Sequence, residues 1–344
     1  MKIILDAMGG DHAPEAPVMG AIAAAKLYQT QITLVGRGQE ILDVLKKNGI
    51  ENLPDGVQIA NADDVVDMHD DPAEAVRKKK NSSMMVGLRM LSEEQGDAII
   101  SAGSTGALLS GATLIVKRVK GIRRAAMGPA MPNKAGGKTV ILDCGANAEC
   151  TPEFLLQFGL VGSLYAKKYL GVENPKIGLL NIGTEDTKGT PLQKEAYVLL
   201  QDAGNRGIIN FVGNVEARDV PLGAVDVVVC DGFAGNVLLK SIEGTASFMG
   251  SLVSRMFKKN LITKIGALCC NSGIKSLKKM LDYREIGGTQ FLGIKKPVIK
   301  AHGSSNALAF RNAVKQAMDA AKSDISQELE QGLAALSPKE PAND

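Results

Sequence analysis

One arrangement recurs along this chain and constrains its fold more than any other feature: a short apolar run, a polar loop that contains glycine, and then a helical pattern. The clearest copy begins with Val227–Val229, which is apolar at every position, and continues through a small-residue turn over residues 231–236. A run without polar alternation is typical of a parallel strand that is covered on both faces. The turn and the helix after it direct backbone N–H groups toward the space above the sheet, where phosphate and other anions are favoured. Taken alone, this segment is explained equally well as an ordinary turn between a strand and a helix.

Further copies of the arrangement make a shared site the better interpretation. Apolar runs end in such loops at residues 5–11, 100–106, 142–147, 180–186 and 301–306. If the strands belong to one open α/β sheet, their carboxyl ends converge on one crevice, which is where such folds bind ligands. The sequence therefore predicts a Rossmann-like, open, mostly parallel α/β sheet with helices on both faces.

The domain organisation follows from the extent of this pattern. We expect residues 1–330 to form one large α/β unit, with residues 249–281 as an insertion, and residues 331–344 to form a flexible tail. The segment 121–138 is basic and is expected to be irregular.

Composition removes several classes of function. The net charge is +3, aromatic residues make up 4% of the chain and tryptophan is absent, so we expect no nucleic-acid partner. The five cysteines form no CxxC pair, which indicates reduced thiols rather than a disulfide framework. No apolar run approaches the ~20 residues that span a bilayer, so a cytoplasmic protein that is at most peripheral to a membrane is expected.

Two motifs that suggest cofactors or metals have plainer explanations. Gly36 and Gly38 resemble part of a dinucleotide fingerprint, but Ile41 occupies the third glycine position, which favours a plain turn. Acidic residues in the segment 63–71 lie beside the basic residues 78–80, which favours a solvated surface over a metal site. We therefore expect neither a metal ion nor a cofactor.

Residues 249–281 differ from the rest of the chain. No acidic residue occurs between Glu243 and Asp282, whereas this stretch contains seven basic ones. Apolar residues recur at helical spacing, so the pattern is a basic amphipathic helical hairpin, typical of an element that binds an anionic membrane surface or a partner. A helix pair packed on its own domain or on a second copy of the chain would give the same pattern. The residues expected to contact a membrane are Phe257, Leu261, Ile265, Leu268, Lys258, Lys259 and Lys264.

Two loops carry groups suited to anionic substrates. The loop at 181–189 is not a P-loop, because Lys188 precedes its glycine, yet it combines an amide, a carboxylate and an ammonium. We expect Lys188 to supply positive charge to an anionic substrate or an oxyanion. We expect Asn236 to bind phosphate or the reacting carbonyl, because Gly232 and Gly235 let backbone amides approach closely.

Seven motifs in these loops form a specific set. They are LDAMGGD at 5–11, SAGSTGA at 101–107, LDCGAN at 142–147, NIGTED at 181–186, GNVE at 213–216, DGFAGN at 231–236 and HGSSN at 302–306. Together they resemble the PlsX family of phosphate acyltransferases of bacterial phospholipid synthesis, from the first strand to about residue 320. Ser104 and Thr184 depart from that family, which usually has Asn and an acidic residue at these two positions.

The resemblance implies a reaction and its partners. Acyl-[acyl-carrier-protein] and inorganic phosphate would give acyl phosphate and free carrier protein. A membrane glycerol-3-phosphate acyltransferase of the PlsY type would then take the product at the inner face of the plasma membrane. The resemblance also implies a homodimer and a fold similar to isopropylmalate dehydrogenases and phosphotransacetylases.

Such a reaction needs an anion cradle and oxyanion donors rather than a protein nucleophile, because phosphate itself attacks the thioester. His12, His69 and His302 are the only histidines, and no Ser/His or Cys/His set is evident. The catalytic candidates are Lys188, Asn236 and His302. The substrate-binding candidates are Asp6, Gly9, Gly10, Asp11, Ser104, Thr105, Asn147, Asn181, Gly183, Glu185, Asp231, Gly232, Phe233, Gly235, Ser304, Ser305 and Asn306.

Two other classes of protein remain as alternatives. An NAD-dependent hydroxyacid dehydrogenase of similar fold lacks support, because there is no full GxGxxG and no paired-Asp metal site beside an Arg cluster. A non-catalytic scaffold recruited to membranes does not account for the many polar loops at one sheet edge. Nicotinamide absorbance tests the first alternative, and trapping of acyl phosphate with hydroxylamine tests the second.

Overall fold

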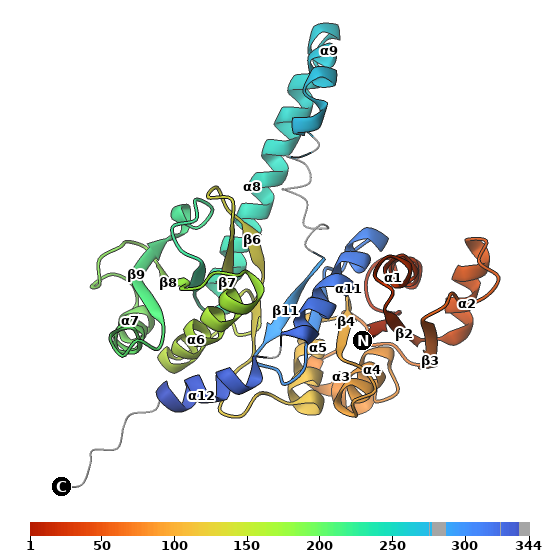
Figure 1. Ribbon diagram of the computed structural model, residues 1–344, viewed down its shortest axis with the longest axis horizontal. Helices are drawn as coiled ribbons and strands as arrows, with labels where there is room; N and C mark the ends of the chain where they lie inside the picture. Colours follow the sequence, from red (N-terminus) through yellow and green to blue (C-terminus); the bar gives the residue numbers. More distant parts are fainter. Residues whose placement is uncertain (275, 277–286, 324, 337–344) are drawn as a thin grey trace.

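The computed structural model describes residues 1–274, 276, 287–323 and 325–336, and its strands form two sheets (Figure 1). The seven-stranded sheet has the order β3 (Val57–Asn61), β2 (Gln31–Gly36), β1 (Lys2–Asp6), β4 (Ala98–Ser101), β12 (Val298–Ala301), β11 (Gly288–Leu292) and β5 (Ala126–Gly128). The five-stranded sheet has the order β6 (Ala130–Pro132), β7 (Lys138–Leu142), β10 (Val227–Val229), β8 (Lys176–Asn181) and β9 (Asn210–Glu216). Among the described strands of these two sheets, only the pairings of β11 and of β6 are antiparallel. The predicted class, a mostly parallel α/β protein, is confirmed, but the strands lie in two sheets rather than one.

Helices cover both faces of the seven-stranded sheet. Its strands are apolar on both sides, so that Ile3 and Leu5 enter one core cluster while Ile4 enters the opposite one. One face carries α1 (Glu15–Tyr28), α2 (Gly38–Lys47) and α11 (Ala307–Lys322). The other face carries α3 (Pro72–Lys78), α4 (Ser83–Ser92), α5 (Thr105–Gly111) and the π-helical turn η1 (Ala112–Val116).

The five-stranded sheet is covered in the same way. One face packs against α6 (Pro152–Tyr169), α7 (Pro191–Asn205) and α12 (Ser326–Leu336). The other face packs against the first turns of α8 (Gly232–Lys258), with the short helix η2 (Ala217–Asp219) at its margin. Helix α12 continues to Leu336, so residues 331–336, which we assigned to the tail, are helical, because Leu329 and Leu333 pack into this core. Residues 337–344 lie outside the described residues.

The expectation that residues 121–138 are irregular is wrong, because this segment contains the two strands that connect the sheets. Strand β5 pairs with β11, β6 pairs with β7, and only Pro129 separates β5 from β6. Each strand has three residues, too few for a recognisable periodicity. Their conformation depends on strands that are distant in the sequence, which a local pattern does not reveal.

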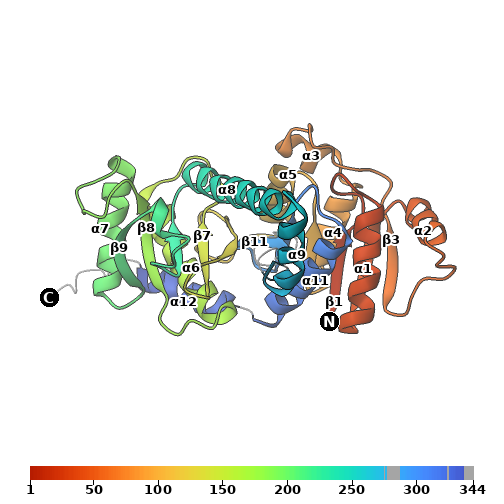
Figure 2. The same ribbon diagram turned by 90° about the horizontal axis from the view of Figure 1, so that it is seen from above.

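Helix α8 is 27 residues long and leaves the body of the protein after its first turns. Its buried residues are Gly232, Gly235 and Leu238, and beyond them the helix projects away from both sheets and leads into α9 (Leu261–Cys269) (Figure 1). Seen from above, α8 starts over the five-stranded sheet and leans toward the side of the seven-stranded one (Figure 2). The predicted insertion at 249–281 is therefore a continuation of a helix that begins in the candidate site. The part of the predicted hairpin that contains Lys275, Leu277, Lys278, Lys279 and Leu281 lies outside the described residues.

Candidate active site

Three loops of the seven-stranded sheet come together at the carboxyl ends of β1, β4 and β12, which are adjacent parallel strands. The Asp11 backbone N–H donates to the Gly303 carbonyl at 2.8 Å, which joins the β1 loop to the β12 loop. Gly10 has a φ of +101°, and a Cβ there would lie 3.0 Å from both the Ala102 Cβ and the Gly303 oxygen. A larger residue would separate these loops, so glycine is required at this crossing.

Asp6 lies beneath these loops rather than at their surface. It is 1% exposed, and its carboxylate accepts hydrogen bonds from the Ser101 hydroxyl at 2.6 Å and from the Met8 N–H at 3.1 Å. Burial raises the pKa of Asp6, and these hydrogen bonds oppose the rise. Gly9 is also buried, with the Gly103 nitrogen 2.7 Å from its Cβ position. The two residues therefore hold the loops in place.

Polar side chains of the same loops cap two helices. Ser104 accepts from the Ala107 N–H at 3.5 Å at the start of α5, where Thr105 is the first residue. Asn306 accepts from the Ala309 N–H at 3.0 Å at the start of α11. These caps satisfy backbone donors that the helices leave unpaired.

His302 and Ser304 form a local pair in the β12 loop. The Ser304 backbone N–H donates to the His302 Nδ1 at 3.2 Å, and the Ser304 hydroxyl lies 2.8 Å from the same nitrogen. Because Nδ1 accepts a hydrogen bond, the neutral ring carries its proton on Nε2.

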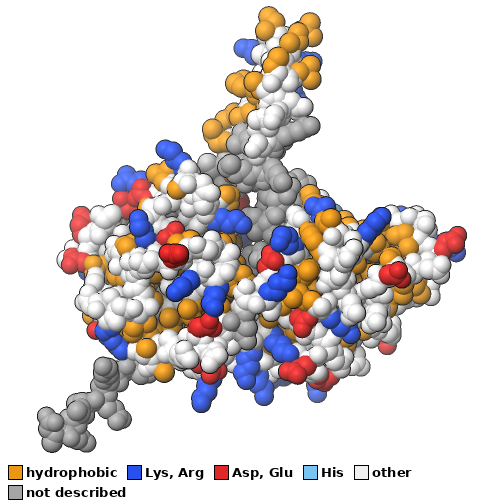
Figure 3. Space-filling model, viewed as in Figure 1, with side chains coloured by type: hydrophobic (Ala, Val, Ile, Leu, Met, Phe, Trp, Pro, Cys, Tyr) orange, Lys and Arg blue, Asp and Glu red, His pale blue; other side chains and the backbone are white. Residues whose placement is uncertain are grey.

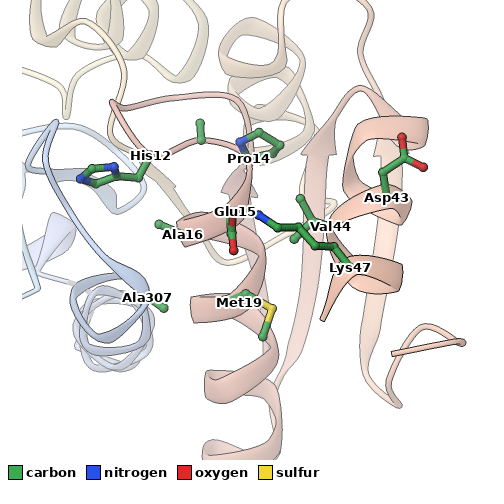
Figure 4. A pocket seen from close by; sticks show the side chains of 10 residues that line it. His12, Pro14, Glu15, Ala16, Met19, Asp43, Val44, Lys47 and Ala307 are labelled. Atoms are coloured by element: carbon green, nitrogen blue, oxygen red, sulfur yellow. Dashed lines mark hydrogen bonds and ion pairs between the residues drawn. The ribbon is translucent and has the colours of Figure 1, made fainter. Parts of the chain in front are cut away.

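A pocket of about 610 Å³ opens beside the β1 loop, between α1, α2 and the first residue of α11 (Figure 4). Its lining includes His12, Met19 and Val44, and Glu15 and Lys47 face each other across it with an ion pair of 2.8 Å. This pocket combines an apolar floor with a charged rim next to the loops described above.

The second group of loops lies at the ends of β7 and β10 and is held by Asp143. Its carboxylate accepts from the backbone N–H groups of Met127, Ala146 and Asn147 at 2.8, 3.2 and 2.6 Å. Burial raises the pKa of Asp143, which these hydrogen bonds oppose. Since Met127 belongs to β5, the Asp143 contact also fastens this group to the edge of the seven-stranded sheet.

The start of α8 packs very closely on the Asp143 loop. The Gly232 N–H donates to the Asn147 carbonyl at 2.7 Å, and a Cβ on Gly235 would lie only 1.9 Å from the Asp143 carbonyl oxygen. Asp231 caps the helix by accepting from the Ala234 N–H at 2.8 Å, and Phe233 is 70% exposed. The turn is therefore rigid, and its tightness explains both glycines.

Asn236 differs from its polar neighbours in this turn. Its side chain lies 3.8 Å from the Cβ position of Gly145 and makes no hydrogen bond with any residue that the structure describes. A side-chain amide that is held by a rigid turn and forms no hydrogen bond within the described protein is suited to donate a hydrogen bond to a substrate oxygen.

The third group is the loop after β8. The Asn181 amide donates to the Lys188 carbonyl at 3.1 Å, and the Cβ position of Gly183 lies 2.7 Å from a Glu185 oxygen. Lys188 is exposed and forms no ion pair within the described part of the chain. No hydrogen bond or ion pair among the described residues joins this loop to the Asn236 turn or to the β12 loop. The predicted site residues thus lie in three groups, one on the seven-stranded sheet and two on the five-stranded sheet.

Sequence reasoning did not select Asp143 or Lys300 as site residues. Asp143 had a signal, because Leu142–Asp143 repeats the Leu5–Asp6 pair at the end of another apolar run. Lys300 had none, since it stands in a segment that reads as an ordinary strand.

Comparison with solved structures first shows that the chain has a fold like that of phosphotransacetylases. The chain is similar to a phosphotransacetylase from Streptococcus pyogenes, with a TM-score of 0.59 and 19% identity over 96% of this chain and 94% of that one. At this identity the likeness concerns the fold alone.

The family follows from the sequence matches. Residues 1–328 match the family described as fatty acid synthesis protein, and the chain belongs to that family. A relative named phosphate acyltransferase from Alkaliphilus oremlandii is 48% identical over 340 residues, 99% of each chain. Another of the same name from Brevibacillus brevis is 47% identical over 333 residues, 97% of each chain.

Proposed function

We propose that this chain is a phosphate acyltransferase that converts acyl-[acyl-carrier-protein] and inorganic phosphate into acyl phosphate and free carrier protein. The observation that carries the proposal is the match to phosphate acyltransferases along nearly the whole chain. The rigid turn that presents the Asn236 amide supports it, because acyl transfer to phosphate requires fixed donors around a thioester carbonyl.

The reaction balances without a nucleophile from the protein. An oxygen of the hydrogenphosphate dianion attacks the carbonyl carbon, the C–S bond breaks, and the proton that phosphate carries ends on the sulfur of the carrier. Asn236 donates to the developing oxyanion, and Lys188 supplies positive charge. The Nε2–H of His302 donates a hydrogen bond to the leaving sulfur.

The test is the release of carrier thiol from an acyl-carrier-protein thioester. We expect thiol release to require phosphate, and Asn236→Ala to lower the rate by about 10²-fold, the usual effect of losing one oxyanion donor. Asn205→Ala, at the end of α7, is the matched control and should behave as wild type. Thiol release that is independent of phosphate would contradict the proposal.

We also propose that the end of α8 together with α9, called here the α8–α9 tip, binds an anionic membrane surface. Within the described residues, no helix is long and apolar enough to cross a bilayer. The tip nevertheless exposes a cluster of apolar side chains (Figure 3): Phe248, Met249, Met256, Leu261, Ile262, Ile265 and Leu268.

Basic side chains accompany this cluster and support a surface location. Lys258, Lys259 and Lys264 are exposed, whereas Phe257 is half-buried. Each cation contributes up to about 1 kcal/mol of binding free energy near anionic lipid. The apolar side chains contribute further binding free energy when they insert among the lipids. The acyl chain of the product is poorly soluble, and α8 connects the candidate site directly to the tip.

Sedimentation with anionic liposomes tests the tip. We expect Leu261→Glu/Ile265→Glu to abolish binding, while Leu27→Glu/Leu222→Glu, which changes exposed apolar residues on the body by the same charge, retains it. Sedimentation of both variants with the liposomes to the same extent as wild type would refute the membrane proposal. A change in molecular mass on the same substitutions would instead indicate that a second copy of the chain covers the tip.

The remaining partners rest on the family resemblance. We propose that the protein acts as a homodimer at the inner face of the plasma membrane. There it passes acyl phosphate to a membrane glycerol-3-phosphate acyltransferase.

A further inference from the structure

Lys300 is a buried lysine directly under the loops of the seven-stranded sheet. It is 9% exposed and lies on β12, in register with Ser101 of β4 and Thr289 of β11. Its ammonium donates to the Ala102 carbonyl at 3.2 Å and to the Ala301 carbonyl at 2.5 Å. The side chain therefore links the two loops that lead into α5 and α11.

Two carboxylates interact electrostatically with this ammonium, and neither forms a salt bridge with it within the described part of the chain. They are Asp11 in the β1 loop and Asp6 at the end of β1. The residues in register with Lys300 on β4 and β11 are Ser101 and Thr289, which are uncharged. Burial lowers the pKa of Lys300 to about 8, and the two carboxylates oppose this shift. Burial thus disfavours the protonated form of Lys300, and the two nearby carboxylates favour it.

The charge matters because these loops contain little else that is cationic. In residues 6–14, 100–107 and 298–309, Lys300 is the only Lys or Arg, whereas Asp6 and Asp11 are both acidic. Without Lys300, an anionic substrate at these loops would meet uncompensated negative charge.

The β12 loop also holds a polar group that the fold does not use. Ser305 is 1% exposed, and its hydroxyl has no hydrogen-bond partner among the described residues. It directly precedes Asn306, which caps the sixteen-residue helix α11, so a hydroxyl and a helix N-terminus adjoin. Both are donors suited to a phosphate oxygen.

We propose that Lys300 is a positioning residue for phosphate: its ammonium offsets Asp6 and Asp11 and fixes the β4 and β12 loops so that the start of α11 can hold the anion. This inference rests on the proposed function and assigns the loop that binds phosphate in that reaction. Lys300 acts through the loops and does not itself contact phosphate.

The decisive variants are Lys300→Met, which keeps an unbranched side chain one atom shorter and removes the charge, and Lys300→Met/Asp11→Asn. We expect Lys300→Met to raise the KM for phosphate at least tenfold with a smaller change in kcat. Asp11→Asn in that background should recover several-fold of the loss, because it removes the charge that Lys300 offsets. Lys296→Met, which removes a neighbouring lysine paired with Glu94 at the surface, is the control and should leave the KM unchanged.

A measurement on the wild-type protein tests the role of Lys300 without a substitution that could prevent folding. The KM for phosphate of the wild type should rise as the pH passes about 8, where phosphate is already a dianion and Lys300 loses its proton. A flat wild-type profile, or an unchanged KM in folded Lys300→Met, would overturn the role of Lys300. Failure of the wild type to release thiol in the presence of phosphate would instead overturn the proposed function.

Discussion

Replacing Gly235 by alanine tests the tightest contact in the candidate site. The added Cβ would lie 1.9 Å from the Asp143 carbonyl oxygen and 2.8 Å from the Cys230 sulfur. Real Cβ atoms essentially never approach within 3.0 Å, so α8 and the Asp143 loop must separate by at least about 1 Å. Both partners are anchored, the loop by the hydrogen bonds of Asp143 and the helix by its Asp231 cap. Overpacking of this kind costs about 1–3 kcal/mol of unfolding free energy, and we expect the upper end because backbone must move.

The same displacement should impair catalysis more than it impairs stability. Asn236 follows Gly235 directly, and a misplacement of about 1 Å costs roughly 10²-fold in rate. We expect the rate of phosphate-dependent thiol release to fall by about that factor, in protein that circular dichroism shows to be folded.

A second glycine in the same helix provides the control. Gly244 has no atom within 4 Å of its Cβ position, so Gly244→Ala should be neutral or raise the unfolding free energy by about 0.5–1 kcal/mol. Denaturant unfolding of Gly235→Ala and Gly244→Ala distinguishes the cost of the close contact from the change in helix propensity, since only Gly235→Ala introduces that contact. Wild-type stability and rate in Gly235→Ala would refute the rigid-turn explanation.

Three further predictions concern charged residues. Asp143→Asn should lower the unfolding free energy by about 1–3 kcal/mol, measured by denaturant unfolding, because an amide NH₂ replaces an oxygen that accepts backbone N–H groups. Lys188→Met should raise the KM for phosphate or lower kcat about tenfold; a wild-type rate curve would make Lys188 a surface lysine. The pKa of Lys300 falls from 10.5 in the unfolded chain to about 8 in the folded one. Between pH 8 and pH 10.5 the unfolded state therefore binds more protons than the folded state. The unfolding free energy should rise by about 3 kcal/mol across this range. That rise should be absent in Lys300→Met; an unchanged pH profile of the unfolding free energy would contradict this.

The sequence predicted the features that depend on local pattern. Strands such as Val227–Val229 and the glycine loops after them are encoded within a few residues, and the α/β class followed from their repetition. Apolar and basic residues at helical spacing likewise indicated helices in the α8–α9 tip. The pattern did not show that Phe257 lies at the end of α8 while Leu261 begins a separate helix, α9, which Asn260 caps.

Features that depend on contacts between distant residues were not predictable. The division into two sheets depends on β5 and β6, whose six residues acquire strand structure only by pairing with β11 and β7. The burial of Lys300 depends on loops about 200 and 300 residues earlier in the chain. The motifs gave a set of candidate residues, but not their separation into three groups.

The most direct test of phosphate as the nucleophile is a single turnover of an acyl-carrier-protein thioester with hydroxylamine as the trap. Hydroxylamine also cleaves the thioester directly, so this background is measured without enzyme and subtracted. Direct attack then predicts that enzyme-dependent hydroxamate forms only when phosphate is present and in equal amount to the carrier thiol that the enzyme releases. Transfer of the acyl group to the protein in the absence of phosphate would contradict it. The Ser304 hydroxyl beside His302 would then be the first residue to examine.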